Sequence, residues 1–304
     1  SSQVSPNLFL WRPLPGSPII KFQGQDYFHL QAATFRDVLQ MAALSYDWPT
    51  VLHYGLGTYL VMIGSWVSAC IPFVMMDHFR WGQAWRIQKN AKGEPVRAAV
   101  DPYVRRRAAK MVIVNWTWLL PVNLLAAPVY KELFPADAPA PAWWQAPFLG
   151  LFWFLLHDIC FYCYHRLLHE VPSLYKHVHK QHHIFTAPFA WTSIATHPVE
   201  TLLQSVGGLL GPLLHSAFFG LPVHALWIWL GLITIQGVFD HSGYDLPLPF
   251  DIFGMLPGFG GTHFHDDHHR YFNCNYAAAF SMIDDFMGTS RKSGYLEKQR
   301  SKQL

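Results

Sequence analysis

Histidine is the residue in this sequence that is best placed to do chemistry, because neutral imidazole is the commonest nitrogen ligand of iron, zinc and copper in proteins. The chain contains 18 histidines, and 15 of them lie between His157 and His269. His165 and His169 are four residues apart, which places them on one helix face. Two later groups have the spacing i, i+3, i+4, again a single face: His179, His182 and His183, and His265, His268 and His269. Three such faces can converge to hold more than one metal ion.

Nine imidazoles form the predicted ligand set, and two ions with four or five nitrogen ligands each would use them all. A nitrogen-rich site with open positions suits iron, copper or zinc, whereas carboxylate sites suit magnesium or calcium. A single histidine more often satisfies a hydrogen bond in the core, but that explanation does not account for three clusters. The predicted ligands are His165, His169, His179, His182, His183, His241, His265, His268 and His269.

Carboxylates near these histidines are expected to orient the imidazole rings. Asp158 is the first candidate, because it precedes His165 by seven residues and His169 by eleven and so shares their helical stripe. Asp266, Asp267 and Glu200 are weaker candidates, and no catalytic residue is predicted beyond the metal ligands. Three histidines keep an open role: His157 as a tenth ligand or a neighbour of the site, His197 as a substrate-side or structural residue, and His263 off the face of its cluster.

The composition indicates that these residues are positioned by membrane-embedded helices. Hydrophobic residues make up 51% of the chain, and charged residues make up 13%, about half the usual share. The net charge of +3 is small and gives no argument for a nucleic-acid partner. The four cysteines form no disulfide framework, and the C-x-x-C pair at Cys160 and Cys163 is interpreted as packing residues within an apolar helix.

Five uncharged stretches are long enough to cross a bilayer, which takes about 20 residues of helix. The last two form one run without a charged residue from Thr201 to Phe239, which would be a helix of about 58 Å and is therefore divided into a hairpin at Gly220. The fold class is thus predicted to be all-α, a multi-span integral membrane protein with a cytosolic helical cap that holds a histidine-rich dimetal site. The predicted spans are residues 48–76, 111–130, 138–157, 201–219 and 223–239.

The remaining organisation follows from these spans. Residues 47–304 are predicted to form one membrane-embedded domain, and residues 1–46 an extended or interfacial segment, in which residues 26–46 form a helix on the membrane surface or an ordinary packed helix. The segment 77–110 is rich in Arg and Lys, so the positive-inside rule places it in the cytoplasm. Counting spans from there puts every histidine cluster on the same, cytoplasmic side.

The histidine motifs resemble a known family. H-R-L-L-H at 165–169, H-K-Q-H-H at 179–183 and H-D-D-H-H at 265–269 resemble the three histidine boxes of the fatty acid hydroxylase/sterol desaturase superfamily. The intervening motifs T-A-P-F, H-P-V-E and D-H-S-G-Y-D, at 186–189, 197–200 and 240–245, are similar to its sterol branch, which includes C-4 methylsterol oxidases and cholesterol 25-hydroxylase.

This resemblance implies a membrane-bound di-iron monooxygenase of the endoplasmic reticulum that uses O2 to oxidise an unactivated C–H bond of a sterol. It also implies electrons from NAD(P)H, delivered through a separate reductase and a b-type cytochrome. Zinc could replace iron in purified material, since imidazole sites accept both. Two alternatives stay open: an acyl-lipid or sphingolipid hydroxylase or sterol desaturase with the same site, and a membrane protein that binds metal or sterol without turnover.

Overall fold

The computed structural model describes residues 21–22, 25–26, 46–94, 96, 101–247, 250–251, 253 and 258–291. Strands β1 (Lys21–Phe22) and β2 (Gln25–Asp26) pair antiparallel near the N-terminus. Of the helix expected over residues 26–46, the structure describes only Asp26, which belongs to β2, and Tyr46; the rest of the segment predicted over residues 1–46 lies outside the described residues.

Five long helices make up the body of the described chain. The first is built from α2 (Trp48–Thr50), the π-helical η1 (Val51–Leu56) and α3 (Gly57–Phe79), which continue into one another. Each of the five is long and apolar enough to cross a membrane, which confirms the predicted all-α, multi-span fold class. The other four are α4 (Pro102–Leu133), α5 (Ala146–Glu170), α7 (Pro198–Phe219) and α8 (Val223–Asp240).

Local sequence signals fix where these helices begin. The carboxylate of Asp101 accepts a hydrogen bond from the backbone N–H of Tyr103, and proline occupies the first position of α4. Helix α5 begins later than the range 138–157 predicted for the third span, after a segment rich in proline. It then continues past Asp158 as far as Glu170, and this extension carries His165 and His169.

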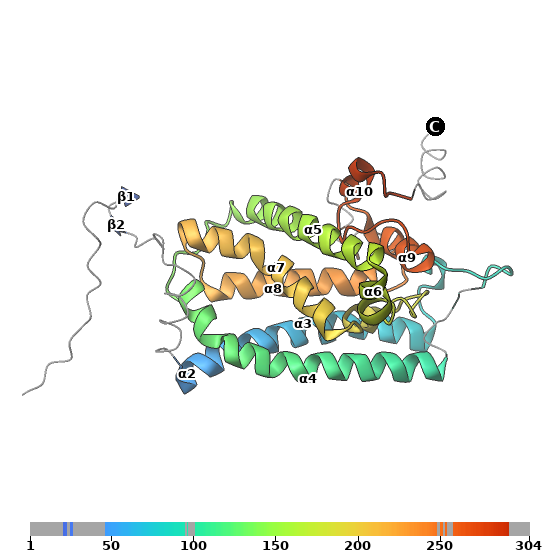
Figure 1. Cartoon of the computed structure of the whole chain (residues 1–304), viewed down its shortest axis with the longest axis horizontal. Coiled ribbons are helices and arrows are strands. Elements are labelled where there is room, and N and C mark those ends of the chain that lie inside the picture. Colours follow the sequence, from blue (N-terminus) through green and yellow to red (C-terminus); the bar gives the residue numbers. More distant parts are fainter. Residues whose placement is uncertain are drawn as a thin grey trace, which may run out of the picture.

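The five long helices run back and forth along a common direction, and the shorter helices gather at one end of them (Figure 1). That end contains the carboxyl ends of α5 and α8, and the segment between α3 and α4 also lies there (Figure 1). All three histidine motifs therefore lie at the same end of the helical body. The shorter helices are η2 (Gln83–Trp85), α6 (Pro172–Leu174), η4 (Tyr175–His179), η5 (Ala190–Ile194), α9 (Gly261–Tyr271) and α10 (Ser281–Met287).

Small residues let α5 and α7 approach each other closely. A Cβ atom placed on Gly211 of α7 would lie 2.8 Å from Cδ1 of Trp153 on α5, so a side chain there would force the helices apart. Trp153 in turn packs edge to face against Trp229 of α8, with the ring centroids 5.7 Å apart. Helices α5, α7 and α8 are therefore packed together around Trp153.

Candidate metal centre

The nine histidines predicted as ligands converge in two groups, and within each group the candidate ligand atoms all lie within 4.8 Å of one another. Eight of the nine side chains are buried, and His169 is half-buried. Among the described residues, the larger group contains five imidazoles and the smaller one four. The first group is His165, His169, His179, His183 and His268, and the second is His182, His241, His265 and His269.

Residues that are neighbours in the sequence belong to different groups. His182 and His183 are consecutive, yet the first belongs to the smaller group and the second to the larger. The same holds for His268 and His269 on α9. Consecutive residues on a helix point about 100° apart, whereas residues four apart share a face. In the motifs at 179–183 and 265–269, therefore, the pair spaced i, i+4 faces one ion position and the remaining histidine faces the other.

The spacing of the imidazole nitrogens matches that of ligands on a shared ion. Nitrogens that are each about 2.1 Å from one ion lie about 3.0 Å apart at a right angle and about 3.4 Å apart at a tetrahedral angle. In the first group, Nε2 of His179 lies 2.8 Å from Nε2 of His169 and 3.1 Å from Nε2 of His165. In the second group, Nε2 of His265 lies 3.1 Å from Nε2 of both His241 and His269. The donor set therefore fits two nitrogen-bound transition-metal ions.

Backbone carbonyls select the tautomer of four of these rings. A carbonyl oxygen can only accept, so each of these Nδ1 atoms carries the proton and leaves the Nε2 lone pair free for a metal. The rings are thus held ready for ligation without a carboxylate partner. The four pairs are His165 with Tyr276 at 2.7 Å, His268 with Cys274 at 2.7 Å, His241 with Gly237 at 2.8 Å and His182 with Ala195 at 3.2 Å.

Burial keeps the ligand candidates in the neutral form that binds metal. Desolvation lowers the pKa of His268, His179 and His241 to about 3 in each case. The pKa of His182 is also lowered, with desolvation as the largest cause. Neutral imidazoles at physiological pH need lose no proton before coordination.

Glu200 is the carboxylate that meets a ligand candidate directly. Its Oε1 lies 3.0 Å from Nδ1 of His179, and both side chains are buried. The sequence suggested Glu200 only as a weaker candidate than Asp158. Helix α7 brings it to the site because it begins at Pro198, beside η4, which carries His179.

Asp158 is fully buried, and its hydrogen bonds go to a loop rather than to an imidazole. Its carboxylate accepts from the backbone N–H groups of Ala278, Ala279 and Phe280, at 2.6, 2.8 and 2.7 Å. Because Tyr276 lies just before these residues, Asp158 holds the loop whose carbonyl orients His165.

Asp266 and Asp267 both lie on α9 among the histidines. Asp266 is buried and accepts a hydrogen bond of 2.9 Å from the side chain of Gln88, which also donates to the carbonyl of Thr186. Desolvation raises the pKa of Asp266 to about 6 and also raises that of the half-buried Asp267. Asp266 therefore connects α9 to the segment that follows α3.

The three histidines left open by the sequence lie outside both groups. His157 is buried on α5, and its Nδ1 forms no hydrogen bond of normal geometry with any described residue. His197 caps the start of α7, where its Nδ1 accepts from the backbone N–H of Val199 at 3.2 Å. Nε2 of His263 lies 3.2 Å from a carboxylate oxygen of Asp245.

A segment that the sequence presented only as a basic loop packs against the second histidine group. Arg86 is 5% exposed, and its guanidinium lies 3.2 Å from the carboxylate of Asp77 and 4.5 Å from the ring centre of Tyr244. It also donates to the carbonyl of Ser242, the residue after His241. No helical or alternating pattern predicted this contact, since it joins two irregular segments far apart in the chain.

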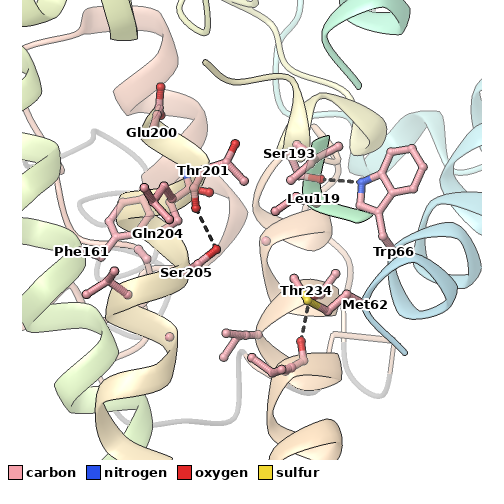
Figure 2. A pocket seen from close by; sticks show the side chains of 18 of the residues that line it. Met62, Trp66, Leu119, Phe161, Ser193, Glu200, Thr201, Gln204, Ser205 and Thr234 are labelled. Carbon is pink, nitrogen blue, oxygen red and sulfur yellow. Dashed lines mark hydrogen bonds between the residues drawn. The ribbon is translucent and has the colours of Figure 1, made fainter. Parts of the chain in front are cut away.

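An apolar cavity of about 260 Å³ reaches the histidines from between the long helices. Rings from both groups form its inner end, namely those of His165, His182, His241 and His265. Figure 2 shows side chains from the surrounding helices along its wall, with Trp66 on one side and Phe161 on the other. A lipid-sized apolar molecule in this cavity would meet both ion positions.

Comparison with known proteins agrees with this geometry. The family model for fatty acid hydroxylase matches residues 150–289, which include all nine histidines. A putative methylsterol monooxygenase of Dictyostelium discoideum is 34% identical over 243 residues, 79% of this chain and 85% of the relative. A methylsterol monooxygenase of Arabidopsis thaliana is 30% identical over 240 residues, 78% of this chain and 85% of the relative.

Not all similar proteins carry a sterol name. A very-long-chain aldehyde decarbonylase of Oryza sativa is 33% identical over 241 residues, 77% of this chain and 85% of the relative. No solved structure gives a significant match. Since the matched region carries the histidine motifs and the relatives are covered over most of their length, this oxidoreductase, integral to the membrane, belongs to the fatty acid hydroxylase superfamily.

Proposed function

We propose that the protein is a membrane-bound di-iron monooxygenase that uses O2 to oxidise an unactivated C–H bond of a sterol, as a C-4 methylsterol oxidase or a sterol hydroxylase. The observation that carries this proposal is the pair of histidine groups at the inner end of an apolar cavity. The resemblance to methylsterol monooxygenases supports the substrate class.

The nine histidines are the proposed ligands of the two ions, and the residues around them hold the rings in place. Iron bound in this shell would supply the activation of O2 that an unactivated C–H bond requires. Glu200 positions His179, and Asp158 acts on His165 through the loop at 276–280. Asp266 holds α9 against Gln88. The cavity wall excludes water and places the substrate carbon beside the ions.

The electron source proposed is NAD(P)H, acting through a separate reductase and a b-type cytochrome. We place the protein in the endoplasmic reticulum with the metal centre on the cytoplasmic side. The basic segment between α3 and α4 lies at the same end of the helices as the histidines, which supports this orientation under the positive-inside rule.

One alternative has a specific observation behind it. The rice relative named for very-long-chain aldehydes is about as similar to this chain as the methylsterol relatives are. An acyl chain would also suit an apolar cavity between membrane helices, so an acyl-lipid substrate with the same metal centre is the second candidate. A sterol desaturase would share this centre too. A protein that binds metal or sterol without turnover is the third.

Expression in a yeast strain that lacks its own C-4 sterol oxidases tests the proposal. Mass spectrometry of the extracted lipids is expected to show a sterol that has gained oxygen, with the label from 18O2. The same strain expressing His182→Ala should lack this product. Labelled acyl lipid without labelled sterol would overturn the sterol assignment, and the absence of any labelled lipid would overturn the oxygenase.

A further inference from the structure

One buried histidine faces the cavity without belonging to the metal centre. His157 is 7% exposed and lies near the middle of α5, so it sits within a proposed membrane span. It lines the cavity, and its Nδ1 lies beside the backbone of Gly207 but forms no hydrogen bond of normal geometry with any described residue. Burying a polar ring inside a membrane span without a hydrogen bond costs free energy. Ionisable residues inside a span commonly mark a binding site.

The position of His157 separates it from the metal ligands. It precedes His165 by eight residues, a rise of about 12 Å along the helix. The ring of Phe161 lies between the two, with its centroid 6.0 Å from that of His157 and 4.9 Å from that of His165. His157 is therefore too far along α5 to ligate an ion but faces the same cavity.

The neighbouring helix α7 packs two glycines beside this imidazole and adds a second polar group. A Cβ atom on Gly207 of α7 would lie 3.6 Å from Nδ1 of His157, and one on Gly208 would lie 4.0 Å from it. Gln204 lies on α7 about one turn nearer to the metal centre, and it also lines the cavity (Figure 2). Its carboxamide forms no hydrogen bond with any described residue.

We infer that His157 and Gln204 form a polar subsite that binds the hydroxyl group of a sterol whose oxidised carbon lies far from that hydroxyl, because His157 is about 12 Å along α5 from His165. This inference rests on the proposed function as a sterol hydroxylase, since a C-4 methyl group lies too close to a 3-hydroxyl to reach the ions from this subsite. A neutral imidazole offers one donor and one acceptor, and a carboxamide offers two donors and one acceptor, so both match a hydroxyl group, which donates and accepts. A hydrocarbon chain would leave both side chains unpartnered, so the subsite selects a sterol alcohol over a fully apolar lipid.

Equilibrium binding to the metal-loaded protein in nanodiscs tests this inference without turnover. The probes are a radiolabelled 3-hydroxysterol without a methyl group at C-4 and its 3-deoxy analogue. The wild-type protein is expected to bind the alcohol about tenfold more tightly, as for one buried hydrogen bond. His157→Phe keeps an aromatic ring but no nitrogen, so the two affinities should become nearly equal. Gln204→Leu should reduce the ratio, and His157→Gln should restore part of it.

Matched controls separate this role from others. Phe161→Leu changes the cavity wall without removing a polar group, so it should weaken both sterols alike and keep their ratio. All variants should hold two metal ions, whereas loss of an ion from His157→Phe would mean that the residue acts as a ligand. Equal affinities in the wild-type protein would overturn the subsite and leave the oxygenase intact. Failure to bind either sterol would overturn the sterol substrate and, with it, the subsite.

Discussion

At the scale of single residues, the spacing of the histidines sorts them between two ion positions. In the motifs at 179–183 and 265–269, the outer two histidines face one position and the third faces the other. The sequence predicted which residues converge, because shared helix faces follow from spacing alone. It did not predict the division, which depends on how α5, η4 and α9 meet. The roles of Glu200 and of the carbonyls of Cys274 and Tyr276 also depend on these tertiary contacts.

Removing one proposed ligand from either group should abolish activity, and each of the two substitutions should act on a different ion. His182→Ala removes one of four nitrogens in the second group, and His268→Ala one of five in the first. We expect each to lower sterol oxidation by more than about a hundredfold, since even residues that only support ligands cost up to that much. Each variant should also bind less iron by elemental analysis. His53→Ala, at an exposed position in η1, serves as the control and should change neither quantity.

Glu200 should tune the first group without being a ligand. Glu200→Gln keeps the shape of the side chain but replaces the carboxylic group whose Oε1 lies 3.0 Å from Nδ1 of His179. Metal affinity, measured by competition with a chelator, is expected to fall about tenfold. Glu170→Gln is the matched control because Glu170 is exposed and pairs with Arg166. Equal affinities in the two variants would show that Glu200 does not support the site.

At the scale of elements, two buried charged side chains fix the irregular segments around the site. Asp158 of α5 holds the loop at 276–280, and Arg86 holds the residues that follow His241. The long helices could be predicted because an uncharged run of about 20 residues or more usually forms a membrane-spanning helix. These two anchors could not, because each depends on a contact with an irregular segment that carries no periodic signal. Asp158 stood out only for its position on the histidine stripe.

Arg86 provides a test at this scale. Arg86→Met keeps much of the apolar stem but leaves Asp77 and the carbonyl of Ser242 without their guanidinium partner. The segment carrying His241 should loosen, so the iron content should fall from two ions per chain toward one. Asp158→Asn should have its main effect on the first group instead, through the loop that orients His165. If Arg86→Met retained both ions, Arg86 would not anchor the segment that carries His241.

At the scale of the whole molecule, the five helices place the two histidine groups at one end of an apolar cavity. Helix α9 contributes imidazoles to both groups. Helix α5 carries His165 and His169, and His241 directly follows α8. Bound ions would therefore join segments from most of the chain. Metal binding and folding are coupled when the ligands come from segments far apart in the chain, because the unfolded chain cannot assemble the same set of ligands.

Removing the ions should consequently lower thermal stability. Each ion present at about a hundred times its dissociation constant adds about 2.7 kcal/mol, so the loss of one ion alone corresponds to a fall of about 5–10 °C in Tm. Differential scanning fluorimetry before and after treatment with a chelator measures this change, and ferrous iron added back should reverse it. The His182→Ala variant should show a smaller chelator effect. An unchanged Tm after complete removal of metal would contradict the coupling.

The metal content and coordination of the purified protein test the central claim most directly. Elemental analysis combined with X-ray absorption spectroscopy is expected to find two transition-metal ions per chain, each surrounded mainly by imidazole nitrogens at about 2.1 Å. One ion should be lost in His182→Ala and the other in His268→Ala. A protein that oxidises its lipid with no bound metal, or with ions that survive both substitutions, would contradict the account.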